Sequence, residues 1–325
     1  MLAFVVRRSL QAVLALLVVS LLVFIAAHAV SNPVDILINT PGDAQQRGRV
    51  LAALGLEEPM WTQFLVFISG VLHGDLGRSF VHDTPALGLI LERMPATLEL
   101  VIVAMLMAVL LGLPLGLWAG LKPDSGAGRT ILAGSFLALS LPAFWVGLLL
   151  VMVFSVTLGW LPVYGRGPTT LLLGVPVSFL SLEGWRHLIL PATSLALFNL
   201  ALLIRLARGG TRAALRQDYV KFARAKGLAN ARVVGVHVLR NVLIPIVAVI
   251  GPEFASVVAL AIVAETVFAW PGMGKLLIDS ISVLDRPVIL AYLLVTVVLF
   301  IVVNLIVDIL HSALDPRVRV REARG

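Results

Sequence analysis

Long apolar runs constrain the fold of this chain more than any other feature. A bilayer hydrocarbon core about 30 Å thick needs about 20 mostly apolar residues for each helical span. Six stretches reach or approach that length, at about 9–30, 97–121, 131–159, 188–207, 242–266 and 288–310. Of the 325 residues, 59% are hydrophobic and 13% are charged, unlike a soluble domain. The sequence therefore predicts an all-α polytopic membrane protein with six transmembrane helices.

The first run has some features of a secretory signal peptide. It follows Arg7 and Arg8 and ends at Ala27-His28-Ala29, which resembles a cleavage site. Its apolar part is about 20 residues long, whereas that of a signal peptide is about 7–15. We therefore expect an uncleaved transmembrane helix.

The distribution of Lys and Arg favours one topology. With six spans and a cytoplasmic N-terminus, 17 of the 25 basic residues lie in cytoplasmic segments and eight in outer segments, as the positive-inside rule requires. A further apolar run, TLLLGVPVSFLSL from Thr170, is short and contains Gly174 and Pro176, so we interpret it as an interfacial or re-entrant piece. Counting it as a span would place the nine basic residues between Arg205 and Arg240 outside. Both termini are thus predicted to be cytoplasmic.

This topology divides the chain into four segments. They are the cytoplasmic N-terminus with the first helix (1–30), an extracytoplasmic subdomain (31–96), a core of five helices that includes the cytoplasmic loop 209–240 (97–312), and a cytoplasmic tail (313–325). In the subdomain, Trp61, Phe64, Leu65 and Ile68 recur at helical spacing. We expect a helix there, lying on the membrane surface.

Glycines and prolines within the predicted spans indicate how the helices pack and where they are interrupted. Gly112, Gly116 and Gly120 form a small-xxx-small pattern, which predicts close approach of a neighbouring helix. Prolines interrupt helical hydrogen bonding at Pro114, Pro142, Pro191, Pro245 and Pro252, and the freed backbone groups must face protein or water. A water-accessible pathway and a static bundle of kinked helices both agree with this pattern.

Few ionisable residues fall within the predicted spans. A charged side chain at the bilayer centre costs at least about 2.5 kcal/mol on insertion scales, so each should face a partner or a cavity. Glu253, near the middle of the fifth span, is the preferred candidate for lining a pathway, and Glu265 and Asn304 are further candidates. For Glu265 and Asp308, a position at a helix end within reach of water is the simpler interpretation.

No catalytic or metal-binding motif accompanies these features. The chain has no cysteine and no HExxH motif. The segment GMGK at Gly272 resembles a phosphate-binding loop, but Ala269 and Leu276 occupy positions that require glycine and a hydroxyl residue. A net charge of +7 does not by itself indicate nucleic acid, because polytopic proteins distribute basic residues for topological reasons. We predict no enzymatic site, no metal, no bound cofactor and no nucleic-acid partner.

The most basic stretch is DYVKFARAKGLANARVVGVHVLRNVLIP, from Asp218 to Pro245. Within it, YVKFARAKGL combines helix formers with basic residues and then a glycine suited to a helix end. This predicts a short helix over 219–228, parallel to the membrane. A basic loop that anchors the topology and binds anionic headgroups would explain the charge as well.

The order of residues in this stretch resembles a known family. DYVKFARAKGL followed by HVLRNVLIP is similar to the cytoplasmic loop of the B-type permease subunit of bacterial dipeptide, oligopeptide and nickel ABC importers. FVVRRSLQAV, LGLEEPMWTQFLVFISGVLHGDLGRS, ETVFAWPGMGKLLIDSI and VDILHSALDPRVR resemble other parts of that family. The similarity extends over nearly the whole chain.

The resemblance implies a type I ABC importer permease of the bacterial inner membrane. Its partners would be a homologous second permease, two ATPase subunits that bind ATP and Mg, an extracytoplasmic binding protein and membrane lipid. The helix over 219–228 would be the coupling helix that docks into a groove on an ATPase. The resemblance points to Tyr219, Ala223, Arg224, Ala225, Lys226 and Gly227 as its contact residues, with the alanines permitting close approach and Arg224 and Lys226 pairing with ATPase acceptors.

The chain departs from the family pattern in two places, and alternatives remain open. Lys221-Phe222-Ala223 stand where the family has Glu-Ala-Ala, which removes an expected carboxylate, and Ser31-Asn32-Pro33 stand where it has Gly-Asp-Pro. An ion-driven secondary transporter is not supported by an internal repeat or by many buried charges. A membrane scaffold or receptor subunit is opposed only by the kinked spans. Peptides are the preferred substrates over nickel chelates or other small solutes.

Overall fold

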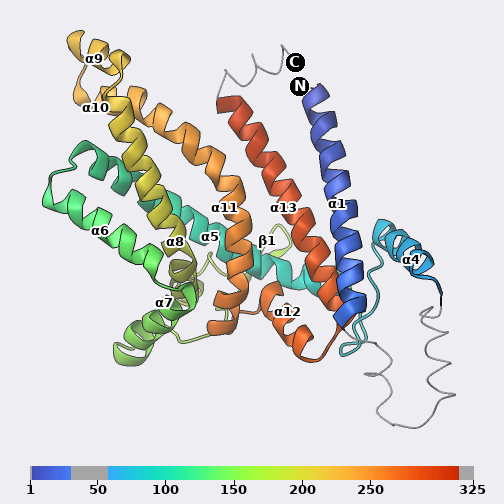
Figure 1. Ribbon diagram of the computed structural model, residues 1–325. Helices are drawn as coiled ribbons and strands as arrows, with labels where there is room; N and C mark the ends of the chain where they lie inside the picture. Colours follow the sequence, from blue (N-terminus) through green and yellow to red (C-terminus); the bar gives the residue numbers. More distant parts are fainter. Residues whose placement is uncertain (1, 31–57, 315–325) are drawn as a thin grey trace. The chain divides into compact units, whose positions relative to one another are not determined.

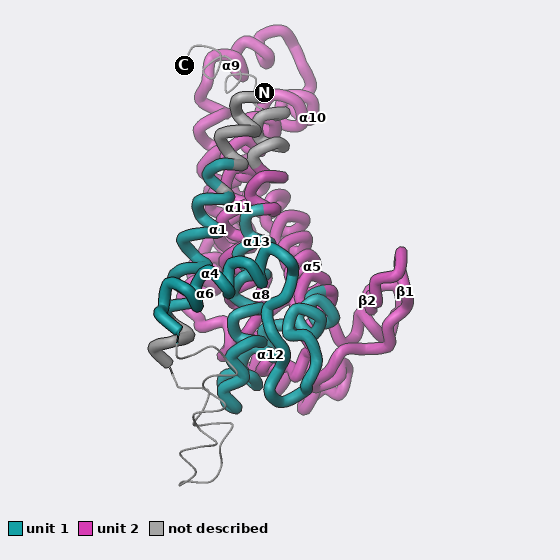
Figure 2. The backbone as a smooth tube through the Cα atoms, turned by 90° about the vertical axis from the view of Figure 1, so that its right-hand side faces the viewer, with its two compact units in different colours: residues 1–94, 273–301 teal, residues 95–272, 302–325 magenta. Residues whose placement is uncertain are grey.

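The computed structural model describes residues 2–30 and 58–314, most of which are helical (Figure 1). The chain divides into two compact units, one made of residues 1–94 and 273–301 and the other of residues 95–272 and 302–325 (Figure 2). The predicted all-α class is confirmed. The departure from the family pattern at 31–33 and the predicted cytoplasmic tail from 315 onward lie outside the described residues.

Unit 1 contains α1 (Leu2–Val30), α4 (Met60–His73), α12 (Met273–Ser282) and the first parts of α5 (Ala86–Leu121) and α13 (Arg286–Leu314). The helix expected in the outer subdomain is present as α4. It packs on α1, where the ring of Phe24 lies 5.4 Å from that of Phe64 and 5.7 Å from that of Phe67. Trp61 and Leu65 stay exposed, so α4 has an apolar surface that α1 does not cover.

A loop after α4 is fixed to the start of α13. Asp285 is buried, and it accepts hydrogen bonds from the hydroxyl of Ser79 and from the N–H of Phe80. Gly77, with φ of +85°, lies against Pro287, so a side chain there would meet the proline ring at 3.5 Å. The segment between α4 and α5 is therefore held by specific contacts to the residues that precede and begin α13.

Unit 2 is built around α8 (Leu182–Leu215). Its other elements are the rest of α5, α6 (Gly126–Ser140), α7 (Ala143–Leu150), the π-helical η1 (Val151–Thr157), β1 (Thr170–Leu172), β2 (Val175–Val177), α9 (Asp218–Ala225), α10 (Asn230–Arg232), the π-helical η2 (Val233–Val238), α11 (Leu239–Val267) and the end of α13. The helices α6, α7 and α11 all contact α8. Ser181 caps α8, because its side chain accepts from the N–H of Gly184.

The predicted close approach of helices at the glycine pattern is confirmed. A Cβ at Gly116 would lie 2.5 Å from that of Ala207, and one at Gly120 would lie 2.6 Å from that of Thr211. Gly112 meets Leu203 one turn away. The glycines therefore let α5 and α8 pack backbone to backbone, since any larger residue would force them apart.

The third predicted span, 131–159, is not one straight helix. It is broken between α6 and α7, which continue as two helices at 109°. The cause is local, because Leu141 precedes Pro142 and is held in an extended conformation with ψ of 131°. Treating the broken pair as one span gives up to five helices that are long and apolar enough to cross a membrane, within the described residues. The sixth span stays a prediction.

The apolar run from Thr170 folds neither as a span nor as a re-entrant helix. It forms an antiparallel hairpin in which Thr170 pairs with Val177. Leu173 and Gly174 make the turn with φ of 51° and 83°, as a two-residue hairpin loop of type I′ requires. The run is therefore not a span, as expected, and its interfacial or re-entrant position stays a prediction. The hairpin agrees with the β-branched valines on both sides of Pro176.

Candidate functional site

The basic loop contains the predicted short helix, which the structure places over Asp218–Ala225 as α9. It ends in a left-handed turn at Gly227, whose φ is +75°. The N–H of Gly227 donates to the carbonyl of Arg224 at 2.9 Å, and that of Leu228 to the carbonyl of Ala223 at 3.3 Å. Glycine suits this position because other residues meet steric strain there.

One side of α9 is anchored in the core of unit 2. Val220 and Ala223 are buried in a cluster that includes residues of four other elements: Ala108, Leu203, Ala207, Ala214, Val233, Val238, Val242 and Ile246. The close packing of this cluster therefore fixes α9 to α8 and α11.

The other side of α9 is exposed. It presents Tyr219, Phe222, Arg224, Ala225 and Lys226, with the Lys226 ammonium 4.6 Å from the centre of the Phe222 ring. Phe222 is absent from the residues expected from the sequence, although its spacing of three from Tyr219 places both on one face. Two aromatic rings and two cations thus form the available surface.

Ala223 does not lie on that surface. The sequence predicted that Ala223 would allow a partner to approach α9 closely. In the structure Ala223 is only 4% exposed and packs inside its own chain. The reason is amphipathicity, because Val220 and Ala223 are three residues apart and share the apolar face of α9. Of the two alanines, only Ala225 is exposed.

A local ion pair removes part of the charge. Lys221 Nζ lies 2.9 Å from Asp218 Oδ1, and this contact holds the pKa of Asp218 below its usual range. Asp218 therefore stays ionised at neutral pH and neutralises Lys221. Arg224 and Lys226 remain as the cations that this helix offers to a partner.

Glu265 occupies a different environment from the one expected. It is fully buried and accepts a hydrogen bond from the hydroxyl of Thr97 on α5. After α11 the chain folds back, so Gly272 contacts the carboxylate and the buried Trp270 donates from Nε1 to the carbonyl of Ala96 at 2.9 Å. The expected position within reach of water is therefore wrong for Glu265.

The other candidates within the spans are separated. Glu253 is half-buried on α11, and its Oε2 is enclosed without a hydrogen-bond partner among the residues that the structure describes. Asn304 of α13 lies against Gly251, whose Cβ position is 3.0 Å from Asn304 Oδ1. Residues 251 and 253 point to opposite sides of a helix, so Glu253 and Asn304 do not share a site. The side chain of Asp308 lies outside the described residues.

A buried ion pair was missed from the sequence. Glu99 on α5 accepts from Arg166 Nε at 3.0 Å through one oxygen. Its other oxygen accepts from the N–H of Ser178 at 2.7 Å and from that of Phe179 at 2.9 Å. Arg166 also donates to the carbonyl of Pro176 at 2.7 Å, so the pair ties the hairpin base to α5. The sequence signal that could have revealed this pair is the position of Glu99 at the edge of a long apolar run, where a carboxylate needs a partner.

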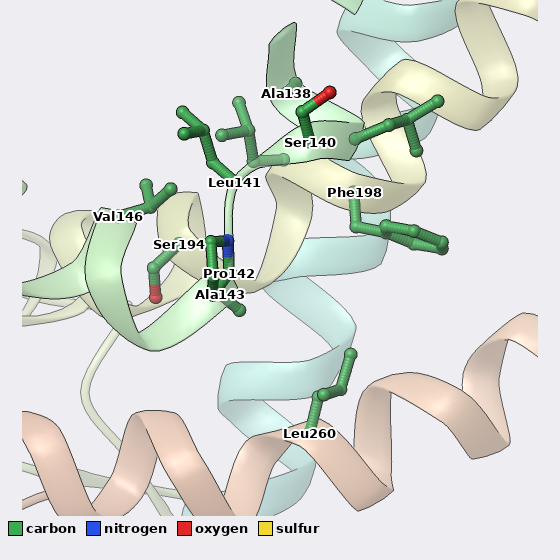
Figure 3. Close-up of a pocket in the computed structure, with 11 residues that line it drawn as sticks. Ala138, Ser140, Leu141, Pro142, Ala143, Val146, Ser194, Phe198 and Leu260 are labelled. Atoms are coloured by element: carbon green, nitrogen blue, oxygen red, sulfur yellow. The ribbon is translucent and has the colours of Figure 1, made fainter. Parts of the chain in front are cut away.

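Figure 3 shows a pocket of about 400 Å³ at the break between α6 and α7. Its lining includes Ser140, Leu141 and Pro142 at the break, Ser194 and Phe198 of α8, and Leu260 of α11. The two serine hydroxyls donate to backbone carbonyls of their own helices. The lining carries no ionisable side chain, so the pocket suits an apolar group rather than a reaction.

The comparison with protein families agrees with this arrangement. Residues 112–320 match the family described as binding-protein-dependent transport system inner membrane component, and residues 1–101 match its N-terminal part. The chain belongs to this family. The resemblance inferred from the sequence is confirmed, and the chain is a permease subunit, a transport component rather than an enzyme. Membership implies that this permease works with partner subunits in an inner membrane.

Relatives and a solved structure extend the match over the chain. The permease is 40% identical to the di/tripeptide transport system permease protein DppB of Pseudomonas aeruginosa (strain UCBPP-PA14), over 98% of this chain and 99% of that protein. It is 36% identical to the oligopeptide transport system permease protein AppB of Bacillus subtilis (strain 168), with the same coverage. The inward-facing MetNI methionine ABC transporter matches with a TM-score of 0.54 at 16% identity, over 70% of this chain and 96% of that chain. That likeness supports the permease fold.

Proposed function

We propose that this permease forms half of the translocation pathway of an ATP-driven importer of di- or oligopeptides. The observation that carries the substrate class is the near full-length match to relatives named as permeases for di- and tripeptides and for oligopeptides. An extracytoplasmic binding protein delivers the peptide. Two separate ATPase subunits bind ATP and Mg, and a homologous second permease supplies the other half of the pathway.

In this proposal α9 is the coupling helix. Its exposed face, formed by Tyr219, Phe222, Arg224, Ala225 and Lys226, docks on an ATPase, and Gly227 allows the sharp turn behind it. Closure of the two ATPases on ATP would displace α9. Since Val220 and Ala223 lock α9 to α8 and α11, the displacement reaches the membrane-spanning helices as a rigid-body motion.

Purification of this chain from its native membrane in mild detergent tests the proposal. Native mass spectrometry should find one copy with one homologous permease and two ATPase chains, and di- or oligopeptides with the binding protein should stimulate ATP hydrolysis by that complex. An isolated monomer or homodimer would contradict the assembly. A complex of the expected composition that responds only to metal chelates would contradict the substrate class.

A further inference from the structure

The pocket at the break between α6 and α7 lies within the predicted membrane-spanning part of unit 2 (Figure 3). Its volume of about 400 Å³ falls in the range of small-molecule sites, about 300–1,000 Å³. Ser194 of α8 and Leu260 of α11 both line it, and each is six residues from the outer end of its predicted span, at 188 and 266. At a rise of 1.5 Å per residue, the pocket lies about 9 Å inside that boundary.

The backbone at the break needs a polar environment. Pro142 gives α7 no side-chain cap, and the N–H groups of Ala143, Phe144 and Trp145 donate to no residue that the structure describes. Irregular backbone is tolerated inside a membrane only where protein buries it or where it lines a water-filled cavity. The break, and the pocket that Pro142 and Ala143 line, therefore belong beside a water-filled space rather than beside lipid tails.

The pocket leads from the surface of unit 2 into its core. Val146 and Ser194 are 8% and 3% exposed and line its enclosed end. Ser140 and Phe198 are exposed and line its rim. A group that approaches from the surface can therefore enter the pocket without first unpacking α6 from α8.

The lining selects by polarity. Nine of the eleven lining residues are apolar, and the hydroxyls of the other two, Ser140 and Ser194, already donate to the carbonyls of Phe136 and Pro191. A polar side chain placed there would lose its hydrogen bonds to water, and the lining side chains offer it no free donor. An apolar side chain would gain free energy by leaving water. The pocket therefore favours an apolar group.

We propose that this pocket receives an apolar side chain, aromatic or large aliphatic, of the peptide that the permease transports. The occupant belongs to a solute and not to a lipid acyl chain, because the interrupted backbone at Pro142 is excluded from hydrocarbon. That the solute is a peptide rests on the proposed function. A peptide without such a side chain passes with the pocket empty, so the pocket adds a preference among peptides and is not required for transport.

Filling the pocket tests this assignment. Ala138→Phe adds a ring to the pocket wall, whereas Ala133→Phe adds the same ring at an exposed position of α6 outside the lining. Each variant is assembled in the complete complex in proteoliposomes, with saturating binding protein loaded with alanylphenylalanine or with alanylalanine. The ratio of the first uptake rate to the second should fall about tenfold in Ala138→Phe, because the phenyl group no longer finds its site. The ratio should keep its wild-type value in Ala133→Phe.

The ratio distinguishes a lost pocket from a damaged fold. General damage lowers both uptake rates in equal proportion, and the binding protein is the same for every variant. If the wild-type complex transports both peptides and Ala138→Phe leaves the ratio unchanged, the pocket assignment is overturned while the proposed function stands. If the wild-type complex transports neither peptide, the proposed function is wrong and the peptide side chain is excluded with it.

A second measurement leaves the chain unchanged. A dipeptide that carries p-benzoylphenylalanine, a photoreactive aromatic residue, is loaded on the binding protein and irradiated with the wild-type complex during turnover. Mass spectrometry should find adducts on lining residues such as Leu141, Phe198 and Leu260. Adducts confined to residues outside the lining would overturn the assignment. So would labelling of these residues by a phospholipid with a photoreactive acyl chain but not by the peptide.

Discussion

The buried ion pair between Arg166 and Glu99 shows how much a single residue can contribute to the stability of this permease. The carboxylate of Glu99 is almost fully enclosed, and Arg166 is the cation that compensates its charge. Removing one member of a buried pair leaves an uncompensated charge in a medium of low dielectric constant. At Glu183 and Arg186, by contrast, both side chains are about half exposed, and solvent screens the charges.

Arg166→Met should therefore lower the free energy of unfolding by about 3–5 kcal/mol. Arg186→Met is the matched control and should cost about 0–1 kcal/mol. Both values come from denaturant or thermal unfolding of the detergent-solubilised complex. Similar losses in the two variants would show that the buried pair does not hold the hairpin base in place.

At the scale of elements, the packing of α5 on α8 depends on the absence of side chains at three glycines. Gly116→Val should destabilise the folded permease by about 1–3 kcal/mol, because the new methyl groups would overlap Ala207. Gly134→Val on α6 is the control, because it makes the same change of residue within a helix. No atom lies within 4 Å of the Cβ position of Gly134, so this variant should not cause overlap. Melting temperatures of the purified complexes compare the two, and equal shifts would contradict close packing at Gly116.

The coupling role of α9 is also a property of an element. Ala225→Trp adds bulk to the exposed face, and Gly227→Pro prevents the left-handed turn, so either should abolish peptide uptake while membrane insertion is kept. Ala127→Trp, at the start of α6, places the same bulk on another exposed site of the predicted cytoplasmic side. Uptake and the amount of inserted chain are measured together. Normal uptake by the α9 variants would exclude this helix from coupling.

At the scale of the whole molecule, topology follows from charge and is open to a direct test. Asp83 and Asp218 have side chains that are 90% and 96% exposed, on segments predicted to lie on opposite sides of the membrane. In intact cells, a membrane-impermeant maleimide should label Asp83→Cys and not Asp218→Cys, and both should react after permeabilisation. Labelling of Asp218→Cys in intact cells would reverse the predicted orientation.

Features that depend on local composition and on the repeat of a helix can be read from the sequence alone. The apolar runs predicted the helical class, and the spacing of Gly112, Gly116 and Gly120 predicted a close contact between helices. The order of residues around Tyr219 predicted both the helix α9 and the protein family. These signals are readable because bilayer thickness and helical geometry impose fixed lengths and repeats.

The surroundings of each polar side chain, by contrast, follow from the packing of the folded chain. Tertiary packing buries Glu265 beneath a folded-back turn, turns Ala223 into the core, exposes Phe222, and pairs Glu99 with Arg166, 67 positions apart in the sequence. The physical reason is that burial and pairing depend on which helices become neighbours. A local pattern specifies the face of a helix, but the register between two helices is set by packing of residues far apart in the chain.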